Sequence, residues 1–139
     1  MFTFFLDENL HGEKFASVLR NADIPIELHK EHFEPGTEDT VWIPEVASRG
    51  WIAVTGDVNT RFNPLEKRAI VISRARMIHV KPGKNATHHV LAVNFVNTYE
   101  KICRFLERND APCLATLTRP SKEEDRLLNK PGNVNPQKL

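Results

Sequence analysis

Three aspartates occupy positions in the sequence that would let them act together. Asp7 directly follows the apolar run 2–6, Asp57 follows the apolar run 51–55 by two residues, and Asp39 lies at the expected start of the helix between them. If the two runs are neighbouring parallel strands, the three carboxylates meet at one edge of a sheet. Close carboxylates repel one another, and a cation such as Mg²⁺ or Mn²⁺, which prefers oxygen ligands, relieves that repulsion. The pattern therefore predicts a metal site suited to phosphoryl chemistry.

The same aspartates have a simpler interpretation. Each of them, taken alone, is also typical of a helix cap or a turn. The recurrence of all three at expected strand ends or helix starts favours the metal site. The polar neighbours that could support such a site are Glu8, Asn9, Glu38, Thr55 and Asn59.

Apolar runs that alternate with amphipathic segments predict the scaffold for these residues. Strands are expected over 2–6, 24–29, 51–55, 77–80 and 113–117, and helices over about 10–21 (with Asn9 as N-cap), 37–47, 63–76 and 87–107. Strands that alternate with helices are typical of an α/β fold with a mainly parallel central sheet flanked by helices. Such sheets bind ligands at the carboxyl ends of their strands, which is where Asp7 and Asp57 are expected.

Length and composition indicate one folded domain. The chain has 139 residues, 40% of them hydrophobic, enough to bury a core without disulfides, and it has two cysteines. We expect the domain to cover 1–118 and the polar segment 119–139 to be a flexible C-terminal tail. No apolar run is long enough to span a membrane and no signal peptide is evident, so the expected location is the cytoplasm, with no membrane partner.

Charge is divided unevenly along the chain. Residues 1–57 hold 4 Lys and Arg against 11 Asp and Glu, a net charge of −7, whereas residues 58–139 hold 15 against 7, a net charge of +8. This division suggests an acidic site beside a basic surface that could hold an anionic polymer. The alternative is that the two sets of charges interleave on a solvated surface.

The motifs around the aspartates also resemble those of a known family. The run Phe4–Leu10, which contains Asp7, is similar to the first-strand motif of PIN-like nuclease domains, and the stretches 38–47 and 50–57 are similar to the family's acid, helix, strand and Thr-x-Asp. Phe62 stands where the family often has an aromatic residue. The best match is to the short VapC-type toxins, and it covers roughly residues 1–62.

This resemblance implies a PIN-like three-layer α/β/α fold and a Mg²⁺- or Mn²⁺-dependent endoribonuclease that belongs to a toxin–antitoxin pair. Asp7, Asp39 and Asp57 would be the metal ligands and catalytic residues, with RNA as the substrate and an antitoxin as the protein partner. Independently of the resemblance, the basic residues Arg61, Lys67 and Arg68 follow Asp57 closely in sequence and could contact the RNA backbone, or they could form the solvated face of a helix. The tail could dock the antitoxin or a second copy of the chain, which would give a homodimer.

The chain departs from the pattern of larger PIN domains in one respect. Those domains carry an additional acid on helices between the first strand and the second acidic motif, and residues 8–38 are too few for that insertion. Glu8, Glu34 and Glu38 are the candidates to take its place. Two alternatives stay open: a catalytically silent PIN-like interaction module, and a receiver-type phosphoacceptor domain with Asp57 after a strand and Lys81 after a later one.

Overall fold

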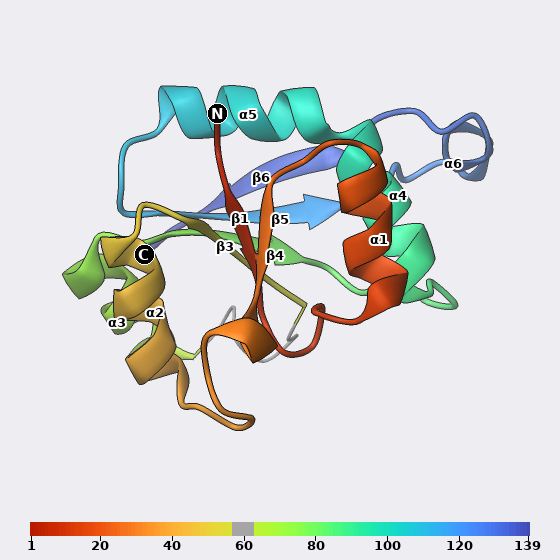
Figure 1. The fold of residues 1–139 in the computed structure, drawn as a ribbon. Helices are drawn as coiled ribbons and strands as arrows, with labels where there is room; N and C mark the ends of the chain where they lie inside the picture. Colours follow the sequence, from red (N-terminus) through yellow and green to blue (C-terminus); the bar gives the residue numbers. More distant parts are fainter. Residues whose placement is uncertain (57–62) are drawn as a thin grey trace.

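Six strands form a single sheet in the part of the chain that the structure, a computed structural model, describes: residues 1–56 and 63–139. The strand order is β2-β1-β3-β4-β5-β6, and the first five strands are parallel while β6 runs antiparallel to β5 (Figure 1). The strands are β1 (Phe4–Leu6), β2 (Ile26–Leu28), β3 (Ile52–Thr55), β4 (Arg76–Val80), β5 (Cys113–Thr118) and β6 (Asn133–Gln137).

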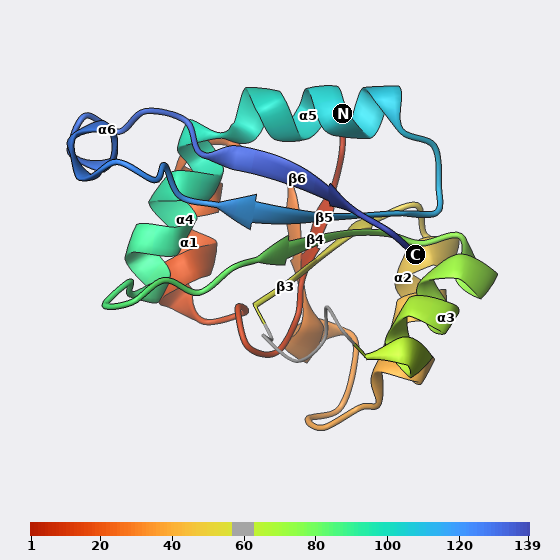
Figure 2. The same cartoon turned by 180° about the vertical axis from the view of Figure 1, so that it is seen from behind.

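Helices cover both faces of this sheet (Figure 2). One face carries α1 (Glu13–Asn21), α4 (His88–Asn97) and α5 (Tyr99–Arg108), whose apolar residues belong to one buried cluster. The other face carries α2 (Asp39–Ser48) and α3 (Pro64–Ser73) in a second cluster. A 3-10 turn, η1 (His29–Glu31), follows β2, and a short α6 (Glu123–Leu127) precedes β6. The architecture is the expected three-layer α/β/α arrangement.

Side-chain alternation along β1 connects the two clusters. Phe4 packs edge-on against Phe95 of α4, with ring centroids 5.3 Å apart, and Phe5 packs against Trp42 of α2 at 5.4 Å. Successive residues of a strand point to opposite faces, and a parallel strand covered on both faces reads as a continuous apolar run. This is why Phe4, Phe5 and Leu6 are all fully buried.

The carboxyl ends of the parallel strands reach the same edge of the sheet. Leu6 of β1 pairs with Val54 of β3, and Thr55 pairs with His79 of β4. The backbone N–H of Asp7 donates to the carbonyl of Val54 at 3.0 Å, which holds the chain against β3 just past the end of β1. Residues that follow β1 and β3 are therefore neighbours, as the sequence predicts.

The C-terminal segment departs from the expectation of a flexible tail over 119–139. Residues 133–137 form β6, which pairs with β5 from Leu114↔Gln137 to Thr118↔Asn133. Val134 is partly buried against the core, and α6 forms between the two strands. Most side chains of β6 are exposed, because β6 lies at the edge of the sheet. Hence the segment has a polar composition and still belongs to the fold.

The expected helix over 87–107 is interrupted where this segment docks. It is divided into α4 and α5 at Thr98, whose hydroxyl donates to the carbonyl of Asn94 at 2.6 Å and accepts the N–H of Gly132 at 2.9 Å. Lys101 Nζ donates to the Gly132 carbonyl at 2.9 Å. None of the described helices is long and apolar enough to cross a membrane.

Candidate active site

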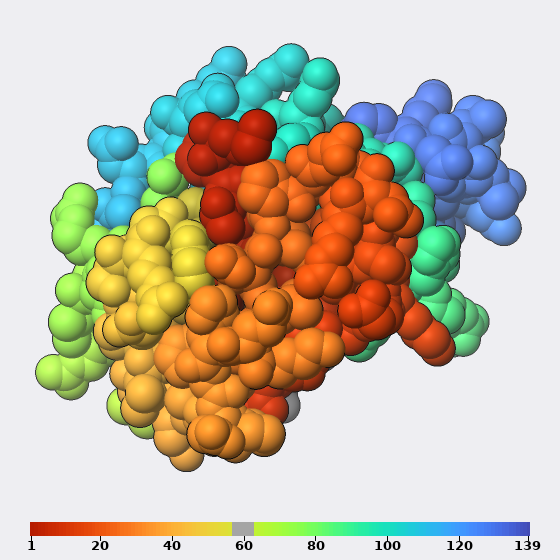
Figure 3. All heavy atoms as spheres, viewed as in Figure 1, coloured from red at the N-terminus to blue at the C-terminus, as the bar shows by residue number. Residues whose placement is uncertain are grey.

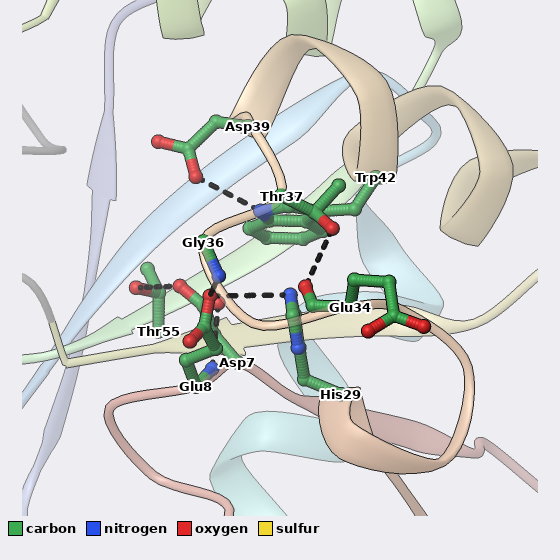
Figure 4. Close-up of polar contacts among 9 residues, drawn as sticks. All are labelled: Asp7, Glu8, His29, Glu34, Gly36, Thr37, Asp39, Trp42 and Thr55. Carbon is green, nitrogen blue, oxygen red and sulfur yellow. Dashed lines mark hydrogen bonds and ion pairs between the residues drawn. The ribbon is translucent and has the colours of Figure 1, made fainter.

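Asp7 is the buried centre of the candidate site. Its side chain is 8% exposed, Oδ1 accepts the backbone N–H of Glu8 at 2.7 Å, and Oδ2 accepts the hydroxyl of Thr55 at 3.0 Å (Figure 4). Burial raises the pKa of Asp7 to about 6, whereas the two hydrogen bonds lower it and the nearby charges of Asp39 and Glu8 raise it. A carboxylate with this environment at the end of a parallel strand is typical of a functional group.

Asp39 is the second carboxylate near Asp7. It is the first residue of α2, and its Oδ1 accepts the indole N–H of Trp42, three residues along the helix, at 2.8 Å. Residues three apart lie on the same face of a helix, so the buried Trp42 holds Asp39 in one orientation. This hydrogen bond uses Oδ1, and Asp39 Oδ2 has no hydrogen bond to any residue that the structure describes. The charge of Asp39 is close enough to raise the pKa of Asp7.

Of the three glutamates proposed to replace the additional acid of larger PIN domains, Glu8 is the one that lies at this edge of the sheet. Its Oε1 accepts the N–H of Gly36 at 2.8 Å and lies 3.6 Å from Nε2 of His29, which is fully buried. Burial lowers the pKa of His29, although the nearby charges of Glu8 and Asp39 raise it. Glu34 and Glu38 are exposed, and Glu38 makes no side-chain cap bond at the start of α2.

Asn9 takes a different role from the expected N-cap. The N-cap of α1 is Gly12, and Asn9 Oδ1 instead accepts the N–H of Gly56 at 2.9 Å. This hydrogen bond ties the loop after β1 to the residue that directly precedes Asp57. Asp57, Asn59 and Arg61 lie outside the described residues.

Two of the three basic residues predicted to contact RNA, Lys67 and Arg68, lie on α3. Lys67 is half-buried and Arg68 is exposed on α3. Two further arginines of the same stretch serve the opposite edge of the sheet, where Arg74 donates to the Ala111 carbonyl at 2.7 Å and Arg76 to the Leu106 carbonyl at 2.6 Å. These two are structural contacts.

Two members of the site were not predicted to take part in it. His29 Nε2 lies 3.6 Å from Glu8 Oε1, and the indole N–H of Trp42 donates to Asp39, so both contact the acidic groups. The spacing of Asp39 and Trp42, one helical turn apart, was the signal available for Trp42. For the residues that the structure describes, no group of three or more His, Cys, Asp and Glu side chains is arranged to hold a metal ion.

Comparisons with known proteins identify the family of the chain. A family profile described as "PIN like domain" matches residues 2–82, which include β1, α2, β3 and the site. The chain belongs to this PIN-like family. A relative named "Putative ribonuclease VapC45", from Mycobacterium tuberculosis (strain ATCC 25618 / H37Rv), is 28% identical over 122 residues, which are 85% of this chain and 86% of the relative. No solved structure matches the chain.

Membership in the PIN-like family favours the nuclease-type interpretation of the strand-end aspartates over the receiver-type alternative. The matched region contains all three predicted aspartates, and it ends at residue 82, just past β4. The strand β5, the helices α4, α5 and α6, and β6 lie beyond the matched region. The similarity to the mycobacterial relative, in contrast, extends over most of the chain.

Proposed function

We propose that this PIN-like protein is a metal-dependent endoribonuclease and the toxin of a toxin–antitoxin pair. The observation that carries the proposal is the buried Asp7 carboxylate at the end of β1, hydrogen-bonded to Thr55 of β3 and close enough to Asp39 for that charge to raise its pKa. The name of the mycobacterial relative supports RNA as the substrate. The antitoxin is the partner that the resemblance to VapC-type toxins implies.

Asp7 and Asp39 suit a hard divalent cation because both present carboxylate oxygens at one strand-end edge. Burying an ionised carboxylate beside a second one is unfavourable unless a positive charge compensates it. Mg²⁺ and Mn²⁺ prefer such oxygen ligands and keep several waters. We propose Asp57 as the third ligand, with Asn59 as a polar support. When bound, such an ion polarises a phosphoryl oxygen and lowers the pKa of water.

The chain's own residues orient these ligands. Thr55 and the N–H of Glu8 fix the two oxygens of Asp7, and Trp42 fixes Asp39. Asn9 holds Gly56, and through it the start of the segment that carries Asp57. Polar partners of this kind determine how precisely a ligand is placed. Arg61, Lys67 and Arg68 remain our candidates to contact RNA near this edge.

A catalytically silent PIN-like interaction module is the second candidate function. It is favoured by one observation: within the described residues, no three acidic or histidine side chains form a group able to hold a metal ion. The two candidates differ in whether the protein hydrolyses RNA at all.

Cleavage of single-stranded RNA by the purified protein tests the proposal. We expect cleavage with Mn²⁺ or Mg²⁺, none with EDTA, and a fall of about two orders of magnitude or more in Asp7→Asn and Asp39→Asn, as for loss of one electrostatic element of an active site. Asp23→Asn, on the exposed surface, is the matched control and should keep full activity. Full activity in Asp7→Asn, or cleavage that persists in EDTA, would exclude the proposed mechanism.

A further inference from the structure

Two adjoining hollows lie where β4 and β5 end. One, of about 410 Å³, lies between α4 and the segment 119–130, and the other, of about 300 Å³, lies between the loop 81–84 and the segment 118–126. Arg119, Pro120 and Arg126 line both hollows. Figures 1 and 3 show the C-terminal segment around α6 standing at this margin of the molecule, beside α4.

The lining of the hollows is basic. It contains Lys and Arg side chains and neither Asp nor Glu; the basic residues are Lys81, Lys84, Arg119, Arg126 and Lys130. Two of them already have partners, since Arg126 donates to the carbonyls of Pro120 and Ser121, and Lys130 lies 3.4 Å from Asp125.

The other three basic side chains of the lining are the ones that could bind a ligand. The side chains of Lys81, Lys84 and Arg119 have no hydrogen bond or ion pair with any residue that the structure describes. Arg119 lies across the loop between the two lysines: its Nη1 is 3.8 Å from the position that a Cβ on Gly83 would take. The three charges are thus concentrated within one loop and the residue packed against it.

Lys81 and Arg119 directly follow the carboxyl ends of β4 and β5, just as Asp7 follows the carboxyl end of β1. The N–H of Lys81 donates to the carbonyl of Leu117, so the chain leaves β4 beside β5 as it leaves β1 beside β3. Three strand spacings of about 4.8 Å separate β1 from β5, which gives a distance of at least about 14 Å along the edge. A polymer bound at Asp7 could therefore extend to the hollows.

We propose that Lys81, Lys84 and Arg119 bind backbone phosphates of single-stranded RNA that flank the nucleotides held at Asp7. The inference rests on the proposed function, because it extends the same substrate along the edge of the sheet. A polyanion whose scissile phosphate approaches the carboxylates of Asp7, Glu8 and Asp39 is repelled there, and cations further along the edge offset the repulsion. Lys and Arg serve as phosphate ligands through their charge and N–H donors.

The charge-neutralising variant Lys81→Gln, Lys84→Gln, Arg119→Gln tests this assignment. Fluorescence anisotropy with a labelled single-stranded RNA, in EDTA so that the RNA stays intact, measures affinity across a range of salt concentrations. We expect about tenfold weaker binding at low salt, and a salt slope that decreases by about 2, since each single-strand phosphate contact contributes about 0.7. A shorter RNA that does not reach beyond the acidic site should bind both proteins equally.

The matched control removes the same charge elsewhere, in Lys14→Gln, Arg104→Gln, Arg108→Gln, on exposed positions of α1 and α5. It should bind RNA as the parent does. The single variant Lys84→Glu, at an exposed position, should also weaken RNA binding. It therefore provides a test even if the triple variant does not fold.

The outcomes separate this inference from the proposed function. If the parent protein cleaves RNA and the triple variant binds and cleaves the longer RNA as the parent does, the hollows are not an RNA site and the ribonuclease proposal stands. If the variant keeps RNA binding but loses affinity for an acidic antitoxin peptide, the hollows bind protein and the inference is overturned. If the parent neither binds nor cleaves RNA, both proposals fail.

Discussion

Asp7 destabilises the folded protein when it is ionised. Burial raises its pKa from 3.8 to about 6, and the charges of Asp39 and Glu8 act in the same direction. A group whose pKa is raised on folding contributes stability below its unfolded pKa and loses that contribution as the pH rises through the folded value. With 1.36 kcal/mol for each unit, the loss between about pH 3 and pH 7 is about 3 kcal/mol.

Replacing Asp7 with asparagine should therefore stabilise the metal-free protein at neutral pH. Asn has no charge to bury, so we expect Asp7→Asn to raise the free energy of unfolding at pH 7 by up to about 3 kcal/mol. The advantage should shrink from pH 6 downward and vanish only below about pH 3, where Asp7 of the parent is protonated in both the folded and the unfolded state. Urea unfolding in EDTA across this pH range measures the effect.

The exposed variant Asp23→Asn is the control for Asp7→Asn, and it should show no such pH dependence. A difference between Asp7→Asn and the parent that stays constant from pH 4 to pH 7 would mean that the Asp7 carboxylate is not titrating in this range. The stability experiment is independent of catalysis, so it bears on the electrostatics of the site alone.

At the level of elements, the C-terminal segment docks through the backbone of Gly132, which forms hydrogen bonds to side chains at the start of α5. Gly132 donates its N–H to Thr98 at the junction of α4 and α5, and its carbonyl accepts from Lys101. A Cβ at Gly132 would lie 2.0 Å from the backbone carbonyl oxygen of Thr118 and 2.8 Å from Oδ1 of Asn94. No side-chain rotation relieves the first of these approaches.

Gly132→Ala should consequently destabilise the whole domain. Forcing an extra methyl group into a packed site typically costs about 1–3 kcal/mol, and here the neighbour is backbone, so we expect the upper part of that range or detachment of β6. Differential scanning calorimetry measures the loss. Gly12→Ala is the control, since nothing lies within 4 Å of the Cβ it would add. Equal melting temperatures for Gly132→Ala and the parent would show that β6 contributes nothing to the fold.

The elements also show which parts of the fold could be predicted. β1 and β3 are buried on both faces, so their sequences are continuous apolar runs that predict buried strands. β6, in contrast, has mostly exposed side chains and contains Pro136, a composition typical of edge strands that is hard to tell from a loop. Its pairing depends on β5 and Thr98, which are distant in sequence.

Some residues of the candidate site could likewise be predicted from the sequence, and others could not. Asp7, Thr55 and Asp39 could be predicted because strand ends and helix starts follow from local patterns. The buried imidazole of His29 and the indole N–H of Trp42 could not, because apolar periodicity predicts that a side chain is buried without predicting which polar group it meets. The sequence could not show which of Glu8, Glu34 and Glu38 lies at the site. That choice depends on the hydrogen bond between Glu8 and the N–H of Gly36, two residues that are distant in sequence.

At the scale of the whole molecule, the strand order separates the acidic first part of the chain from the basic second part. β2, β1 and β3 come from the acidic first part of the sequence, and β4, β5 and β6 from the basic second part, so their strands do not interleave. The candidate acidic site and the basic hollows therefore lie along one edge of the sheet, on opposite sides of the β3–β4 boundary. This arrangement lets one anionic polymer contact both.

Mn²⁺ should raise the melting temperature of the protein in a pH-dependent way. An ion that binds only the folded state stabilises it by mass action, and it must compete with protons for Asp7. Because the pKa of Asp7 is about 6, most of the carboxylate is protonated at pH 5 and ionised at pH 7. We expect the apparent affinity for Mn²⁺ at pH 5 to be about tenfold weaker than at pH 7, which at saturating Mn²⁺ reduces the stabilisation by about 1.4 kcal/mol.

Melting curves at both pH values, with MgCl₂ or MnCl₂ against KCl of equal ionic strength, measure the shift. Asp7→Asn removes the titrating ligand, so its melting temperature should rise little with Mn²⁺ at either pH, even though the variant is the more stable protein without metal. These opposite effects of one substitution separate a metal ligand from a carboxylate that is merely buried. Equal Mn²⁺ stabilisation of the parent and Asp7→Asn would favour the silent interaction module, because the ion would then bind away from the strand-end carboxylate.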